Sequence, residues 1–192
     1  MSGHPIPRPQ GAALFERLAV LHRPDCTAPM QPPPTEILPD EGEIARALAS
    51  DAAGRYGVAA RAVFNDLRRL VGQLAGLLIL ARLTSRPDHA GLPEVKACRE
   101  REAEIAAQIA ALAAPGPLAP HRDRLSASAG LCRAILDGLV AWRADAPGAD
   151  ATFDALNAQI RRAYAVLETC AETRAGLQMI DFSHACCACG GH

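Results

Sequence analysis

The chain has 192 residues, of which 49% are hydrophobic and 21% are charged, ordinary values for a globular protein that buries a core. Its formal net charge of −1 excludes the basic excess that is typical of nucleic-acid-binding proteins. Aromatic residues make up only 4%, so we expect no stacking platform for single-stranded nucleic acids. Ala and Leu dominate while β-branched residues are scarce, and this bias favours helix over strand.

Hydropathy predicts neither an exported protein nor a membrane protein. Residues 1–10 contain prolines and no apolar segment, which is unlike a secretory signal. The longest apolar stretch, 71–83, is interrupted by Gln73 and Arg82 and is shorter than the roughly 20 residues that cross a bilayer. We therefore predict no membrane span and a cytoplasmic location, in which the seven cysteines remain reduced thiols.

The chain divides into three predicted parts. Residues 1–39 are expected to form a short amphipathic helix over 11–22, followed by a proline-rich, extended linker. Residues 40–180 are expected to form a helical bundle, and residues 181–192 a tail rich in Cys and His.

The bundle region opens with a helix-start signal. Asp40 is suited to cap a helix, and Glu43 stands three residues later as its capping-box partner. We expect this short helix to reach about Ala53. Gly54 and Gly57 then predict a turn.

Four long helices are predicted next, over residues 58–85, 93–113, 118–144 and 150–178. Each carries apolar residues at alternating spacings of three and four, the pattern of a helix that packs along one face. Segments containing Pro and Gly separate them, and short connections make consecutive helices antiparallel neighbours. The sequence therefore predicts an all-α fold, an antiparallel four-helix bundle with one or two short N-terminal helices packed outside it.

The C-terminal tail holds the densest group of metal-binding side chains in the sequence. Thiolates and neutral imidazoles are the ligands that suit Zn²⁺ and Cu(I). Gly190 and Gly191 allow the backbone to reverse, so that the last histidine could approach the thiols. A tetrahedral Zn²⁺ site needs four donors, whereas Cu(I) needs two or three. The predicted metal ligands are His184, Cys186, Cys187, Cys189 and His192.

Other interpretations of the tail remain open. Its spacing matches no standard zinc finger and no common ferredoxin motif. The thiols could have no role, or the tail could be a Cys-rich peptide that another enzyme modifies. His22 and Cys26 could add ligands from the end of the first predicted helix, although a chance pair beside the proline-rich linker is the preferred interpretation.

Three cysteines and two charged residues fall on the predicted core faces of the helices. Cys98, Cys132 and Cys170 could bind Cu(I), but the preferred interpretation is that each acts as a small apolar core residue. Glu102 and Arg174 could form a polar site or a buried pair. We expect instead that both lie near the ends of the bundle, where a charged group reaches water.

No known enzyme signature is present, neither the Glu-x-x-His pairs of di-iron bundles nor a P-loop, a dinucleotide-binding turn or a nucleophile elbow. We therefore predict no catalytic residues and no organic cofactor. The leading hypothesis is a cytoplasmic helical-bundle protein that binds Zn or Cu(I) through its tail, in a structural, delivery or sensing role. The main alternative is a non-catalytic interaction protein, such as a chaperone, adaptor or assembly subunit, with a protein partner or a second copy. An enzyme with an unfamiliar helical site is a further alternative.

Overall fold

The computed structural model describes residues 37–84 and 89–179, and residues 37–180 form one compact unit. The described residues fold into five α-helices and two short 3₁₀ helices, which confirms the predicted all-α fold for this part of the chain. The predicted helix 11–22, most of the linker and the tail 181–192 lie outside the described residues. The elements are α2 (Glu41–Leu48), α3 (Asp51–Thr84), α4 (Pro93–Ala111), η1 (Gly116–Leu118), α5 (Ala119–Ala141), α6 (Ala149–Glu168) and η2 (Thr173–Ala175).

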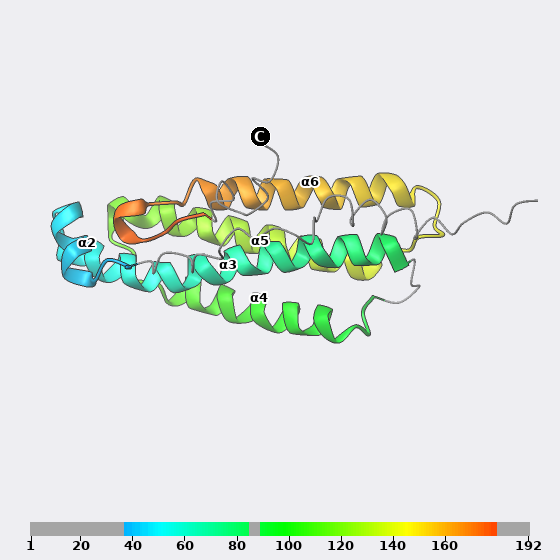
Figure 1. The fold of residues 1–192 in the computed structure, drawn as a ribbon, viewed down its shortest axis with the longest axis horizontal. Coiled ribbons are helices and arrows are strands. Elements are labelled where there is room, and N and C mark those ends of the chain that lie inside the picture. The colour runs from blue at the N-terminus through cyan, green and yellow to red at the C-terminus, as the bar shows by residue number, and fades with distance from the viewer. Residues whose placement is uncertain (1–36, 85–88, 180–192) are drawn as a thin grey trace, which may run out of the picture. The chain divides into compact units, whose positions relative to one another are not determined.

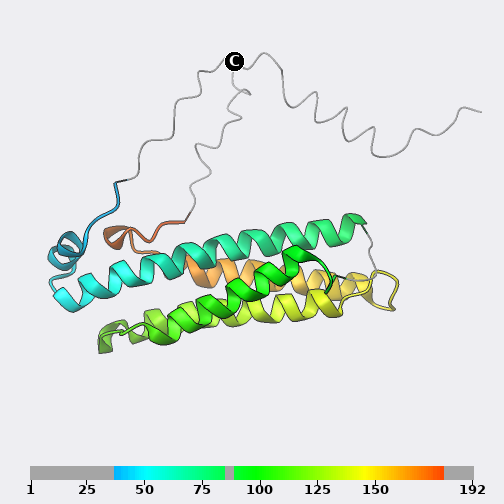
Figure 2. The same ribbon diagram turned by 90° about the horizontal axis from the view of Figure 1, so that it is seen from below.

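The four long helices, α3 to α6, lie side by side and alternate in direction (Figures 1 and 2). Each packs against the next helix in the sequence, and α6 also packs against α3. Helix α2 packs against the first turns of α3. The arrangement follows from the short connections, because a chain that reverses within a few residues must return alongside the helix it has just left.

The core runs along the middle of the bundle and is built from the apolar faces that the periodicity predicts. Fully buried side chains come from each long helix, for example Phe64 of α3, Ile105 of α4, Ile135 of α5 and Leu167 of α6. Residues spaced three and four apart share one face of a helix, which is why the sequence pattern and the burial agree.

The predicted start of α2 is confirmed. The Asp40 carboxylate accepts a hydrogen bond from the backbone N–H of Glu43 at 2.8 Å, and the Glu43 carboxylate accepts one from the N–H of Asp40 at 2.9 Å. The predicted turn at Gly54 and Gly57 is wrong. The chain turns at Ala49, which has a left-handed φ of 53°, and Ser50 then caps α3.

Gly54 and Gly57 are helical residues that allow α2 to approach α3 closely. A Cβ atom added at Gly54 would lie 2.6 Å from the backbone oxygen of Glu41 and 2.9 Å from the Cβ of Ala45. One added at Gly57 would lie 3.1 Å from Ile44 Cγ2. Glycine serves both turns and close helix contacts, and the local sequence does not distinguish the two uses.

The predicted last helix, 150–178, is too long. Helix α6 ends at Glu168, and the chain then turns back through η2 and an antiparallel bridge between Glu172 and Leu177. Cys170 and Leu177 are buried nonetheless. The apolar spacing therefore predicted burial correctly beyond the point where it stopped predicting helix.

Between the exposed Arg69 and Arg82, the outer surface of α3 carries no charge. The residues Gly72, Gly76, Ile79, Leu80 and Leu83 of α3 are called here the outer α3 face. The three large side chains are 61%, 43% and 76% exposed, in that order. A Cβ added at either glycine would meet no atom of the described residues within 4 Å. None of the helices in the described part of the chain is long and apolar enough to cross a membrane.

The glycines of α3 predict opposite effects of the same substitution. Gly54→Ala should lower the free energy of unfolding by about 1–3 kcal/mol, because the new methyl group would press against the backbone of α2. Gly72→Ala should raise it by about 0.5–1 kcal/mol, because alanine is the better helix former and the position is open. Urea denaturation of the dilute protein would measure both. Equal effects of the same sign would contradict this account of α2 packing.

Candidate functional site

A pocket of about 350 Å³ lies at the end of the bundle where α3 and α5 begin and where the chain folds back after α6. We call it the end pocket. Its walls are largely apolar and include Leu48, Ala53, Ala60, Leu118, Ala175 and Leu177. Its polar lining comes from Tyr56, His121, Arg124, Thr169, Glu172 and Arg174. A small concave space of this kind, with few polar groups in apolar walls, is typical of ligand sites.

The segment after α6 forms one wall of the end pocket, and side chains of α3 hold it in place. The guanidinium of Arg61 donates to the carbonyl of Ala175 at 2.9 Å and to the carbonyl of Pro39 at 2.6 Å. Arg68 donates to the carbonyl of Gln178. Gly176 permits the turn, because its φ of +69° is one that side-chain-bearing residues rarely adopt. These contacts explain why α6 ends early although its apolar spacing continues.

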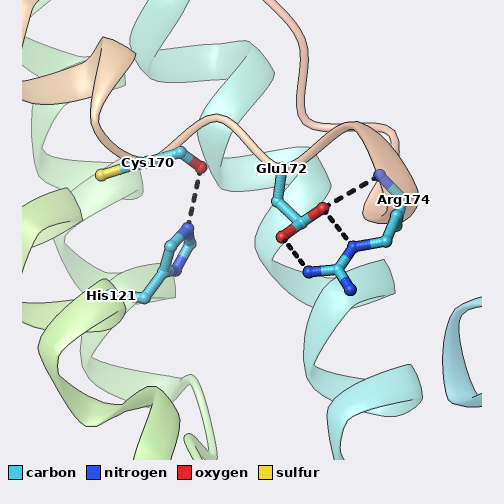
Figure 3. Close-up of polar contacts among 4 residues, drawn as sticks. All are labelled: His121, Cys170, Glu172 and Arg174. Atoms are coloured by element: carbon cyan, nitrogen blue, oxygen red, sulfur yellow. Dashed lines mark hydrogen bonds and ion pairs between the residues drawn. The ribbon is translucent and has the colours of Figure 1, made fainter. Parts of the chain in front are cut away.

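His121 joins this segment to α3 and α5. Its Nε2 lies 3.0 Å from the carbonyl oxygen of Cys170, toward which the ring points in Figure 3. Its Nδ1 lies 2.7 Å from the hydroxyl of Tyr56. A carbonyl oxygen can only accept, so Nε2 carries the proton, and in the neutral ring Nδ1 accepts the Tyr56 hydroxyl.

Burial keeps both partners of this pair neutral. Burial lowers the pKa of His121 from its ordinary value of 6.5, although the hydrogen bond to Cys170 opposes the shift. Burial raises the pKa of Tyr56 to about 12. Because the lone pair of Nδ1 already accepts the Tyr56 hydroxyl, the pair is suited to hold chain segments and orient a bound molecule rather than to remove a proton.

Glu172 and Arg174 form an ion pair at the edge of the end pocket (Figure 3). Nε and Nη2 of Arg174 each lie 2.8 Å from a different carboxylate oxygen of Glu172, which is the two-bond geometry that arginine favours. The pair lowers the pKa of Glu172 and raises that of Arg174. The Arg174 side chain is 58% exposed at the bundle end, as the sequence predicted.

Arg124 is the other cation of the end pocket. Among the described residues, no carboxylate forms an ion pair with it, whereas the neighbouring Arg122 lies 3.1 Å from Asp123. Burial raises the pKa of the Cys170 thiol, and the nearby positive charge of Arg124 opposes that rise. The end pocket therefore has two guanidinium groups and one carboxylate in its lining, with one positive charge in excess.

The cysteines of the described region are core residues, as the preferred interpretation predicted. Cys98, Cys132 and Cys170 are 4%, 0% and 0% exposed. Burial raises the pKa of all three thiols, that of Cys132 to about 12. In the described part of the chain, no three His, Cys, Asp or Glu side chains are grouped so that they could hold a metal ion.

The prediction for Glu102 is wrong. It lies inside α4 rather than near a bundle end, and its side chain is only 7% exposed. Arg133 of α5, 58% exposed, reaches it with Nε 3.1 Å from Oε2 and Nη2 3.0 Å from Oε1. The guanidinium stays in contact with water while it neutralises the buried carboxylate, so no second buried charge is required.

The predicted metal ligands, His184, Cys186, Cys187, Cys189 and His192, lie outside the described residues, as do His22 and Cys26. Sequence reasoning identified Arg174, because a charge interrupted an apolar pattern, but it missed the rest of the end pocket. Nothing in the spacing of Tyr56 and His121, 65 residues apart, predicts their contact.

No protein-family model matches this chain, no curated protein is similar to it, and no solved structure matches it.

The pKa of His121 predicts how stability depends on pH. The unfolded chain binds a proton at His121 more tightly than the folded chain does. The contribution of the neutral His121 to the free energy of unfolding is therefore complete above about pH 6.5. It is lost as the pH falls through the pKa of His121 in the folded protein. Urea denaturation between pH 7.5 and 5 should show the free energy of unfolding falling more steeply in the wild type than in His121→Asn.

Titration of Glu172 does not interfere with this measurement of the His121 effect. The pKa of Glu172 is lowered, so the stability it contributes is lost only below about pH 4.5, outside the histidine range. Identical pH dependence of wild type and His121→Asn between pH 7.5 and 5 would contradict the role assigned to His121.

Proposed function

We propose that this protein is a cytoplasmic helical-bundle protein that binds Zn²⁺ or Cu(I) through its C-terminal tail, in a structural, delivery or sensing role. The observation that carries the proposal is the density of donors, three thiols and two imidazoles within residues 184–192. The ligands would be His184, Cys186, Cys187, Cys189 and His192, because thiolates and neutral imidazoles suit these ions.

The environment of the other thiols supports this assignment. A thiol must lose its proton to bind a metal, and burial raises the pKa of Cys98, Cys132 and Cys170. These three therefore remain protonated at neutral pH and compete poorly for a metal ion. We therefore expect a metal ion to bind to donors outside the core of the bundle.

Metal analysis of the untagged full-length protein tests the proposal. After exposure to Zn²⁺ or Cu(I) under reducing conditions and removal of free metal, the wild type should retain about one ion per chain. Replacing Cys186, Cys187 and Cys189 together by serine should reduce the bound metal to background. Cys98→Ala is the matched control and should retain the wild-type amount.

Equal metal content in the serine variant and the wild type would overturn the proposal. A wild type that retains neither ion would also overturn it.

A second candidate function, a non-catalytic interaction protein, is favoured by the outer α3 face. Glycine in a helix interior costs about 0.5–1 kcal/mol relative to alanine, and no atom of the described residues requires it at Gly72 or Gly76. Two glycines one turn apart leave a shallow notch in the helix surface. Such a notch allows another helix to approach the backbone closely.

We infer that the partner on the outer α3 face is a second copy of this chain. A two-fold interface must be complementary to itself, and this face carries both a notch and the apolar side chains that fill one. An antiparallel crossing near Gly76 would place Leu80 of one copy over Gly72 of the other. The absence of charge from residues 70–81 also fits, because a charge near a two-fold axis would face its own equivalent.

The three exposed side chains provide little area, so the expected dimer is weak and depends on concentration. Light scattering after size exclusion should give a mass that rises toward that of a dimer at high micromolar concentration. Ile79→Glu should remain a monomer, and Val58→Glu, which changes an exposed residue of α3 outside the outer α3 face, should behave like the wild type.

Gly76→Ala distinguishes an effect on dimer formation from an effect on the stability of the monomer. It should raise the free energy of unfolding of the monomer by about 0.5–1 kcal/mol and at the same time weaken the dimer, because its methyl group occupies the notch. A wild type that is monomeric at every concentration, or equal effects of Ile79→Glu and Val58→Glu, would contradict the inferred dimer.

A further inference from the structure

We propose that the end pocket binds a small amphiphilic monoanion, a molecule with an apolar body and a single carboxylate. This inference is independent of the metal-binding proposal, because it concerns the opening between the first turns of α3 and α5 and uses none of the tail residues. It rests on the shape of the end pocket, on the character of its walls and on the charges in its lining.

The walls of the end pocket select an apolar body. Small side chains, among them Ala53, Ala60 and Ala175, leave a space of about 350 Å³ at a point where three chain segments meet. This volume lies near the lower end of the range for small-molecule sites. Leu118 and Leu177 add apolar surface, and a ligand that covers these walls removes them from water.

The charges in the lining select a single negative group. Glu172 holds Arg174 through two hydrogen bonds of 2.8 Å, so this pair is already neutral. None of the ion pairs among the described residues includes Arg124. One guanidinium therefore remains to be matched, and a ligand with one carboxylate would neutralise the end pocket without leaving a charge in excess.

Arg124 also fixes the direction in which such a ligand would bind. It lines the end pocket together with Tyr56 and His121, whereas Arg122 does not. Arg124 and the Tyr56–His121 pair thus make one end of the end pocket polar. The carboxylate would lie at this end, and the apolar body would lie along Ala60 and Leu177.

Octanoate is a suitable probe. Acetate carries the same carboxylate without the long apolar chain, and 1-octanol carries the apolar chain without the charge. Titration of the full-length protein, followed by calorimetry and by backbone amide NMR shifts, should show saturable binding of octanoate with shifts at Tyr56 and His121. Acetate and 1-octanol should each bind at least tenfold more weakly. Arg124→Gln should weaken octanoate binding about tenfold, the effect of losing one charge-assisted hydrogen bond.

Arg122→Gln is the matched control, because it removes the same charge from the adjacent residue, which pairs with Asp123 and does not line the end pocket. It should bind octanoate like the wild type. Ala60→Leu should block binding by filling the space, and Ala171→Leu does the same from the exposed rim if the buried substitution prevents folding.

Three results would overturn the proposal. The first is the absence of saturable octanoate binding at millimolar concentration. The second is an equal loss of affinity in Arg122→Gln and Arg124→Gln, which would indicate a general charge effect. The third is a set of shifts centred on the outer α3 face, which would indicate adsorption to exposed apolar surface instead of binding in the end pocket.

Discussion

Helix α6 ends at Glu168, and side chains from other helices donate hydrogen bonds to three backbone carbonyls of the segment that follows it. His121 of α5 donates to Cys170, and Arg61 and Arg68 of α3 donate to Ala175 and Gln178. Polar backbone groups near a core must be paired, so these bonds determine where the chain can turn. They hold the returning segment against α3 and α5, and this segment completes the end pocket.

The three cysteines of the described residues are all buried. Cys170 is buried beneath the turn, and Cys98 and Cys132 are buried between the long helices. Burial disfavours the thiolate in all three. Their role is therefore to fill space, as an alanine or a valine would. The metal-binding proposal accordingly uses the cysteines of the C-terminal tail, where the density of donors in the sequence is highest.

Glycine has two opposite uses along α3. Near the start of the helix, Gly54 and Gly57 let α2 approach at distances that a side chain would prevent. In the second half, Gly72 and Gly76 face outward, where a side chain would meet nothing in the described structure within 4 Å. The first pair explains a contact that exists within the chain. The second pair, set among exposed leucines and an isoleucine, is the basis for inferring a contact between copies.

The sequence by itself determined the features that depend on neighbours within a few residues. Apolar spacing identified the long helices and the buried cysteines, and the capping box marked the start of α2. Tertiary structure alone decided the early end of α6, the polar lining of the end pocket and the partner of Glu102. The partners concerned are far apart in the chain, 31 residues for Glu102 with Arg133 and 114 for Arg61 with Ala175. A local pattern carries no information about which distant carbonyl or charge a side chain will reach, because that depends on how the helices pack.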